Sequence, residues 1–172
     1  MLRALIFLAS LMPLAALADP QVLSVQSGFL CNVIDSGTEL AEDTLEGHTD
    51  LMDAHMLRVI PTSIAPAAKG IHIGVVLQRD PAYTSPIRAV TTHPPMGPEG
   101  VTQQSFFTNQ TPDGLIGVGW EFEFAYEMLP GDWSISLYDG DVLLHRAQFT
   151  VVPPALFPQD ISICDGGPEL LS

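Results

Sequence analysis

Apolar and polar side chains alternate along much of this chain, and turn-forming residues interrupt the alternation at short intervals. A period of two is typical of half-buried strands, and no long segment has the period of an amphipathic helix. Proline and glycine separate the runs because proline fixes φ and glycine admits positive φ. The predicted strands are residues 21–34, 56–61, 70–78, 86–92, 101–109, 115–128, 133–138 and 142–152. This spacing predicts an all-β fold, an antiparallel sandwich or barrel of about 7–9 strands.

The last two predicted strands form the clearest hairpin. Trp133, Ile135 and Leu137 alternate with Ser134 and Ser136, and an Asp-Gly turn follows. Because successive side chains of a strand point to opposite faces, we expect the three apolar residues in the core and the serines in water.

The preceding strand carries aromatic residues on one parity and glutamates on the other. The aromatic residues are Trp120, Phe122, Phe124 and Tyr126, and the glutamates are Glu121, Glu123 and Glu127. We expect the aromatic residues in the core, since the charged parity accounts for the solvent face. The alternative is a platform that binds a carbohydrate or another ligand.

Residues 35–57 differ from the rest of the chain, because they contain seven acidic residues and no Lys or Arg. Such a stretch is typical of a solvated surface excursion. Ser36 and Glu39 have the spacing of a capping box, which favours a short helix within an otherwise irregular acidic loop.

The N-terminus predicts export. A basic start at Arg3 precedes an apolar run that is too short to span a membrane and ends in small residues at 16–18. We therefore expect a signal peptide at 1–18, cleavage before Asp19, and one β-sandwich domain at 19–172 with an irregular tail at 153–172. No later segment has spanning length, so we expect a periplasmic or secreted bacterial protein without a transmembrane segment.

Charge narrows the range of partners. The chain has 20 Asp and Glu residues against six Lys and Arg residues. The negative electrostatic field of such a chain repels nucleic acid and anionic lipid, and it suits basic partners or divalent cations. A surface that only keeps the protein in solution is the alternative.

Two cysteines, Cys31 and Cys164, lie near opposite ends of the chain that remains after cleavage. In an oxidising compartment an even pair is expected to form a disulfide. This bond would tie the tail to the first strand. A reactive thiol or a metal ligand is the alternative, although no Cys-x-x-Cys motif is present.

No motif in the chain specifies a reaction. A nucleophile elbow, a phosphate-binding glycine loop and a His-Glu-x-x-His motif are all missing from the sequence. We expect His72 to be a satisfied or solvent-facing strand residue and His93, which precedes two prolines, to lie in a turn. The protein is therefore expected to be non-catalytic and to need no cofactor, with an enzyme site assembled from separate loops as an alternative.

One segment could still bind a metal ion. Imidazole, carboxylate and thioether groups come close together in the acidic stretch, at His48, Asp50, Met52, His55 and Met56. Copper accepts His with Met, and zinc prefers His with Asp. The spacing matches no established metal motif, so an acidic loop with incidental His and Met is the competing interpretation.

Several short motifs also occur in a characteristic order. They are Arg58-Val59-Ile60-Pro61, Gly70-Ile71-His72-Ile73-Gly74, His93-Pro94-Pro95, Gly119-Trp120, Pro130-Gly131-Asp132-Trp133, Asp139-Gly140 and Phe149-Thr150-Val151. Over residues 22–152 the chain thereby resembles the bacterial DUF3859 family, from which it departs in having few basic residues and the cysteine pair. The resemblance implies an immunoglobulin-like sandwich in an exported or envelope protein. It implies no catalytic residue, because the family is a domain of unknown function.

We therefore expect a non-catalytic immunoglobulin-like module that binds a protein or another envelope macromolecule through a strand edge or its loops. This expectation rests on analogy of fold. A periplasmic metal-binding protein that uses residues 48–56 is the first alternative, and an enzyme is the second.

Overall fold

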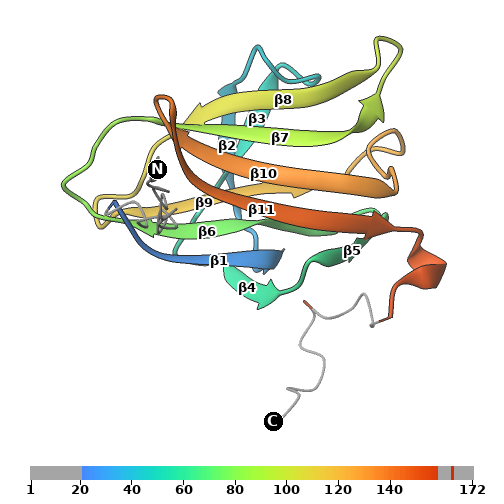
Figure 1. Cartoon of the computed structure of the whole chain (residues 1–172), viewed down its shortest axis with the longest axis horizontal. Coiled ribbons are helices and arrows are strands. Elements are labelled where there is room, and N and C mark those ends of the chain that lie inside the picture. Colours follow the sequence, from blue (N-terminus) through green and yellow to red (C-terminus); the bar gives the residue numbers. More distant parts are fainter. Residues whose placement is uncertain (1–20, 159–163, 165–172) are drawn as a thin grey trace, which may run out of the picture.

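The computed structural model describes residues 21–158 and Cys164, and these form a two-layer β-sandwich (Figure 1). The expected signal peptide and most of the expected tail lie outside the described residues. The first sheet has the order β4 (Arg58–Pro61), β1 (Val22–Cys31), β6 (His72–Arg79) and β9 (Leu115–Glu121). The second has the order β5 (Ile64–Pro66), β11 (Val142–Val152), β10 (Gly131–Asp139), β7 (Ile87–Met96) and β8 (Val101–Thr108).

All neighbouring strands are antiparallel except the short β5, which pairs in parallel with β11. The all-β sandwich predicted from the sequence is confirmed, with nine strands in its two sheets. A short 3₁₀ helix at Pro154–Leu156 follows β11. Among the described residues, no helix has the length and apolar character that a membrane span requires.

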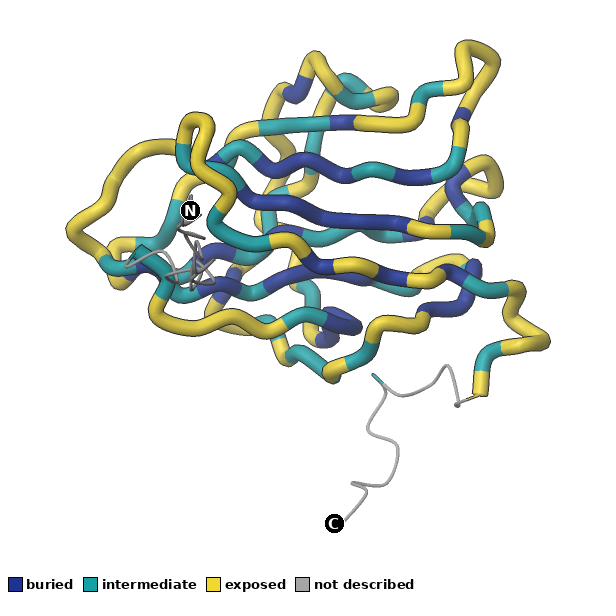
Figure 2. Tube along the Cα trace, viewed as in Figure 1, coloured by how far each residue is buried: buried dark blue, intermediate teal, exposed yellow. Residues whose placement is uncertain are grey.

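The core lies between the two sheets, and the central strands carry most of it (Figure 2). Trp133, Ile135 and Leu137 on β10 are at most 1% exposed, as the alternation predicts. The expectation that Ser134 and Ser136 face water is wrong. Both are buried, and their hydroxyls have partners that offset the cost of burial: the Thr92 hydroxyl bonds to Ser134 Oγ at 2.8 Å, and Arg146 Nε donates to Ser136 Oγ at 2.9 Å.

The acidic excursion forms a two-stranded hairpin, so the expected helix is wrong. Its strands are β2 (Asp35–Leu40) and β3 (His48–Met52), which run across the direction of the sheet strands (Figure 1). Gly37 adopts a φ of 113°, and its N–H donates to Asp35 Oδ1 at 2.7 Å. This local turn replaces the first turn of a helix.

The excursion leaves and rejoins the first sheet at a single point. Cys31, the last residue of β1, is the direct partner of Arg58, the first residue of β4. We call residues 32–57 the arm. Its base packs closely on β9, where a Cβ on Gly117 would lie 2.6 Å from Leu57 Cδ1 and 3.4 Å from Ala54 Cβ. Glycine at position 117 therefore permits the close approach of the arm to β9.

The predicted disulfide between Cys31 and Cys164 is present in the structure. It ties the base of the arm to a residue 133 positions further along the chain. Cys31 is buried, and the cysteine pair packs against the core.

A buried ionic cluster joins the ends of the two sheets. Arg79, the last residue of β6, is fully buried and pairs with Asp139, the last residue of β10. The same guanidinium donates to Gln21 Oε1 at 2.8 Å and to the Ser85 carbonyl at 2.9 Å. We call these four residues the Arg79 cluster. Its guanidinium has both a counter-charge and neutral acceptors, which is what a buried charge requires.

Candidate ligand-binding cleft

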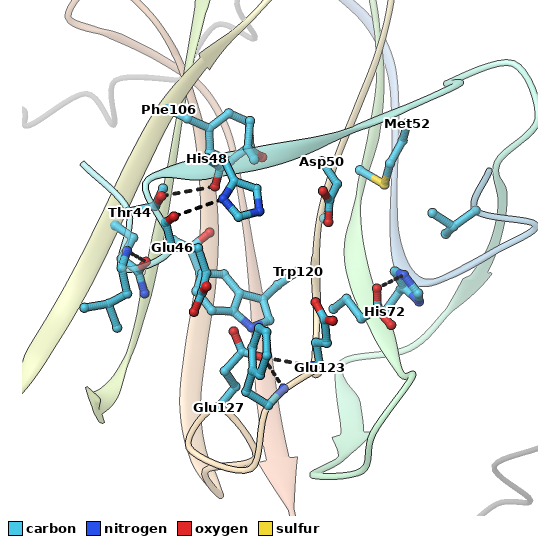
Figure 3. Close-up of a pocket in the computed structure, with 18 of the residues that line it drawn as sticks. Thr44, Glu46, His48, Asp50, Met52, His72, Phe106, Trp120, Glu123 and Glu127 are labelled. Atoms are coloured by element: carbon cyan, nitrogen blue, oxygen red, sulfur yellow. Dashed lines mark hydrogen bonds and ion pairs between the residues drawn. The ribbon is translucent and has the colours of Figure 1, made fainter. Parts of the chain in front are cut away.

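The arm closes the open side of the sandwich, between the edge strands β8 and β9, and encloses a cleft of about 630 Å³ beneath it (Figure 3). One wall comes from β3 and the turn before it, with Thr44, Glu46 and His48. The opposite wall comes from β9 and the loop after it, including Trp120 and Glu123. A smaller hollow of about 330 Å³ shares residues 49–52, Phe106 and Gly119 with the cleft, so the two adjoin along β3.

The cleft is strongly acidic. The carboxylates that line it are Asp35, Glu46, Asp50, Glu121, Glu123 and Glu127. Lys69 is the one lysine or arginine in the described lining. His72, from β6, lies 3.0 Å from Glu121, so that carboxylate has a partner and His72 is satisfied as expected. The other carboxylates leave an excess of negative charge facing the same space.

Aromatic rings form the floor and one rim of the cleft. Trp120 and Phe106 line it, and Phe124 stacks on Tyr126 with ring centroids 5.5 Å apart. Trp120 Nε1 is buried, and it has no hydrogen-bond partner among the described residues. A cationic ligand in this cleft would therefore meet both carboxylates and the faces of aromatic rings.

The predicted core position of the whole aromatic tract is wrong beyond Phe122. Strand β9 ends at Glu121, and Phe122 is buried, but Phe124 and Tyr126 are each 38% exposed. The parity fails because the backbone turns after Phe122, whose carbonyl accepts the Gly70 N–H at 2.9 Å. Phe124 and Tyr126 are therefore accessible at the surface, and for them the ligand-platform alternative stays a prediction.

Glu127 holds this turn together from inside the cleft. Its carboxylate accepts the backbone N–H groups of Glu123 at 2.8 Å and Phe124 at 2.9 Å, and the residue is only 6% exposed. Removal from water raises the pKa of the Glu127 carboxyl, and the negative charges of Glu46 and Glu123 act in the same direction. A positive charge placed beside the Glu127 carboxylate would offset its loss of solvation and its repulsion by Glu46 and Glu123.

Three hydrogen bonds fasten the tip of the arm across the cleft. The Leu45 N–H donates to Gln104 Oε1 at 2.7 Å, and the Ser105 N–H donates to the Asp43 carbonyl at 3.2 Å, both on the β8 side. On the β9 side the Tyr126 hydroxyl donates to Glu46. Burial and this hydrogen bond raise the pKa of Tyr126, so the hydroxyl keeps its proton at neutral pH.

His93 is a core residue, and the prediction of a turn position is wrong. It lies in β7, is 5% exposed, and packs between the rings of Trp120 and Trp133 at 5.5 and 5.3 Å. Pro94 and Pro95, which suggested a turn, lie where the β7–β8 pairing shifts its register between Thr92 and Met96. The missing N–H groups of the prolines are tolerated there, and β7 continues to Met96. Burial lowers the pKa of His93.

The predicted metal-ligating residues are divided between two places. His48, Asp50 and Met52 line the cleft, whereas His55 and Met56 lie in the turn after β3. His55 Nε2 is 3.4 Å from Asp113 Oδ1 instead. Among the described residues no three His, Cys, Asp or Glu side chains gather as a metal site. Metal binding by this segment stays a prediction.

The hydroxyl and imidazole groups of the cleft are engaged elsewhere. Thr44 Oγ1 donates to the Ala41 carbonyl at 2.7 Å, and His48 Nδ1 contacts the Glu46 carbonyl at 2.9 Å. His72 is paired with Glu121. None of these three contacts is the hydroxyl–base pair that nucleophilic catalysis uses.

Comparison with known proteins agrees with this fold. An immunoglobulin-like protein from Pseudomonas aeruginosa is similar in structure, with a TM-score of 0.55 and 19% sequence identity, over 80% of this chain and 100% of that one. None of the curated proteins matches the chain. The family model for a domain of unknown function, DUF3859, matches residues 22–151. The chain therefore belongs to the DUF3859 family, and its fold is an immunoglobulin-like β-sandwich.

Proposed function

We propose that this protein is a non-catalytic binding module that recognises a basic segment of a partner protein and seats a lysine or arginine side chain in the cleft beneath the arm. The observation that carries the proposal is the composition of the cleft lining. Six carboxylates and one lysine surround a space floored by Trp120 and rimmed by Phe124.

Two physical effects act together on a cation in this cleft. Carboxylates at Glu46, Glu123 and Glu127 attract it over a short distance, and the aromatic faces attract it through their quadrupoles. The arm and β8 exclude part of the solvent, which strengthens both effects relative to an exposed acidic surface. The adjoining smaller hollow extends the contact surface beyond a single side chain, which suits a peptide segment rather than a free ion.

We also propose that the module works outside the cytoplasm, in the periplasm or in the medium. The expected signal peptide supports this location, and so does the Cys31–Cys164 disulfide, because such bonds persist in oxidising compartments. The intact mass of the protein isolated from its own cells tests the location. A chain that begins at Asp19 supports it, and an unprocessed chain recovered from the cytoplasm contradicts it.

A capped peptide with three lysines, and the same peptide with glutamine in their place, tests the binding. We expect the lysine peptide to bind, to change the tryptophan fluorescence, and to lose affinity as salt is added. The double variant Glu46→Gln and Glu123→Gln should weaken binding by about tenfold or more.

The matched control removes the same amount of charge from a different surface. Asp132→Asn with Asp141→Asn changes two exposed carboxylates that do not line the cleft. This control should keep the affinity within about twofold, since only screened long-range attraction is reduced. Equal loss in both double variants, or equal binding of the glutamine peptide, would overturn the proposal.

A further inference from the structure

Gln104 connects the arm to the buried His93, and its two hydrogen-bond partners determine which way its side-chain amide points. The Leu45 N–H can only donate, so the atom that faces it at 2.7 Å is the amide oxygen of Gln104. The Gln104 Nε2 group therefore faces His93 Nε2 at 3.0 Å. Since an amide NH₂ group can only donate, His93 Nε2 must be an unprotonated acceptor.

The other ring nitrogen of His93 completes the assignment. Nδ1 lies 2.8 Å from the Pro94 carbonyl, which can only accept, so the single proton of the neutral ring resides on Nδ1. The arrangement accommodates one tautomer and one amide orientation. It does not accommodate the doubly protonated ring, because two donors would then meet at 3.0 Å.

The groups that contact the His93 ring are all uncharged at neutral pH. They are Trp120 from β9, Trp133 from β10, the Gln104 amide from β8 and the Pro94 carbonyl of its own strand. The Met96 sulfur, further along β7, lies 3.9 Å from the Gln104 amide. Burial, which removes His93 from water, lowers its pKa. His93 is therefore neutral at pH 7, and the Gln104 bond to the Leu45 N–H is formed.

We propose that His93 and Gln104 form a proton-operated latch on the arm. A proton taken up from solvent on His93 Nε2 forces the Gln104 amide to turn over and present its oxygen to the imidazolium. The Leu45 N–H then faces the amide NH₂ group and loses its acceptor. The arm tip keeps the Asp43 carbonyl and Glu46 contacts but loses one of its three hydrogen bonds, so the arm is held less tightly over the cleft.

The latch goes beyond the proposed function, because it concerns access to the cleft rather than the ligand inside it. The loosening also reaches the cleft floor, since Trp120 packs on the same imidazole. Acidification would therefore loosen the arm and disturb the aromatic surface together. A bound partner would hold the latch closed, and by linkage it would resist the protonation of His93.

Hydrogen exchange of the Leu45 amide, measured without any ligand on the oxidised protein, tests the latch. After correction for intrinsic rates, protection in the wild type should fall by about tenfold between about pH 7.5 and about pH 5. His93→Gln offers an acceptor that does not titrate and should abolish this pH response. His145→Gln, which changes another partly buried histidine on β11, should keep it.

A second variant keeps the test decisive if His93→Gln does not fold. Gln104→Leu removes the acceptor of the Leu45 N–H, so protection should be low at both pH values with no pH response. Protection in the wild type that is equal at both pH values overturns the latch, and so does an unchanged pH response in either latch variant. Because no ligand is present, failure of the latch and failure of peptide binding are separate results.

Discussion

The Arg79 cluster and the acidic cleft both hold charged groups against the sandwich, but they balance that charge differently. In the cluster one guanidinium is matched by the Asp139 carboxylate and by acceptors from Gln21 and Ser85. In the cleft six carboxylates face one lysine. A buried charge that is fully paired stabilises a particular geometry, whereas an unpaired set favours the arrival of an opposite charge.

The two regions also differ in what surrounds the charges. The Arg79 cluster joins the last residues of two strands, one from each sheet, so neither partner can move without deforming a sheet. The cleft lies under an arm that a few hydrogen bonds hold at its tip. We therefore expect stability to depend on the first region and the proposed peptide binding to depend on the second, and variants should separate these roles.

Arg79→Met should have the largest effect on stability. It leaves the Asp139 carboxylate with little solvent and no counter-charge, which costs about 3 kcal/mol or more in the free energy of unfolding. Urea unfolding measures the loss. Arg58→Met, on an exposed residue of the edge strand β4, is the control and should change stability by less than about 0.5 kcal/mol. Similar losses in the two variants would show that the Arg79 cluster is not structural.

Removal of the disulfide should follow in size. Cys31→Ser with Cys164→Ser should lower the free energy of unfolding by about 2 kcal/mol and the Tm by several degrees, because the unfolded chain is no longer cross-linked. The reduced wild type should unfold at the same temperature as this variant. Affinity for the lysine peptide should not change, since the ties at the tip of the arm lie elsewhere. A variant that keeps the wild-type Tm, or loses peptide binding in proportion to stability, would contradict this separation.

Glu127→Gln should have the smallest effect on stability and the most informative pH dependence. The amide oxygen can still accept both backbone N–H groups, so we expect a change within about 1 kcal/mol at pH 7, with weaker peptide binding. Because the pKa of Glu127 is raised from 4.5, the folded protein binds this proton more tightly than the unfolded chain does.

Protonated Glu127 contributes its full stabilisation of the folded state below its ordinary pKa of 4.5. This contribution is lost as the pH rises through the raised pKa of the folded protein. Glutamine does not titrate, so the Tm of the variant relative to wild type should increase from about pH 4 to pH 7. Calorimetric scans at several pH values measure this difference. A Tm difference between variant and wild type that stays constant with pH would show that ionisation of Glu127 does not destabilise the folded protein.

The framework could be predicted from the sequence because local patterns determine it. Alternation placed Trp133, Ile135 and Leu137 in the core correctly, and proline and glycine placed most of the strand boundaries. The arm could not be predicted, because Ser36 and Glu39 satisfy a helix rule while the positive φ of Gly37 decides for a turn. The capping-box rule considers only the spacing of side chains, so it does not detect the positive φ of Gly37.

The cleft was missed for a different reason. Phe124, Tyr126 and Glu127 continue a strand pattern after the strand has ended, and their reversal depends on the distant contact between Phe122 and Gly70. His93 and Gln104 lie on different strands and carry no local signal at all. The sequence pattern placed Glu127 in solvent, and only the fold shows that it is buried, which marks it as a candidate because ionisable groups are seldom buried without a role.

The strand register at the base of the arm shows that the arm is an insertion within the first sheet. Cys31 and Arg58 are directly paired, so 26 intervening residues, 32–57, are inserted between two adjacent positions of a sheet that is otherwise complete. A hairpin of another length or charge could be spliced at the same point without changing the strand order. We therefore expect the sandwich to tolerate exchange of this one contiguous stretch of the chain while its strand order is kept.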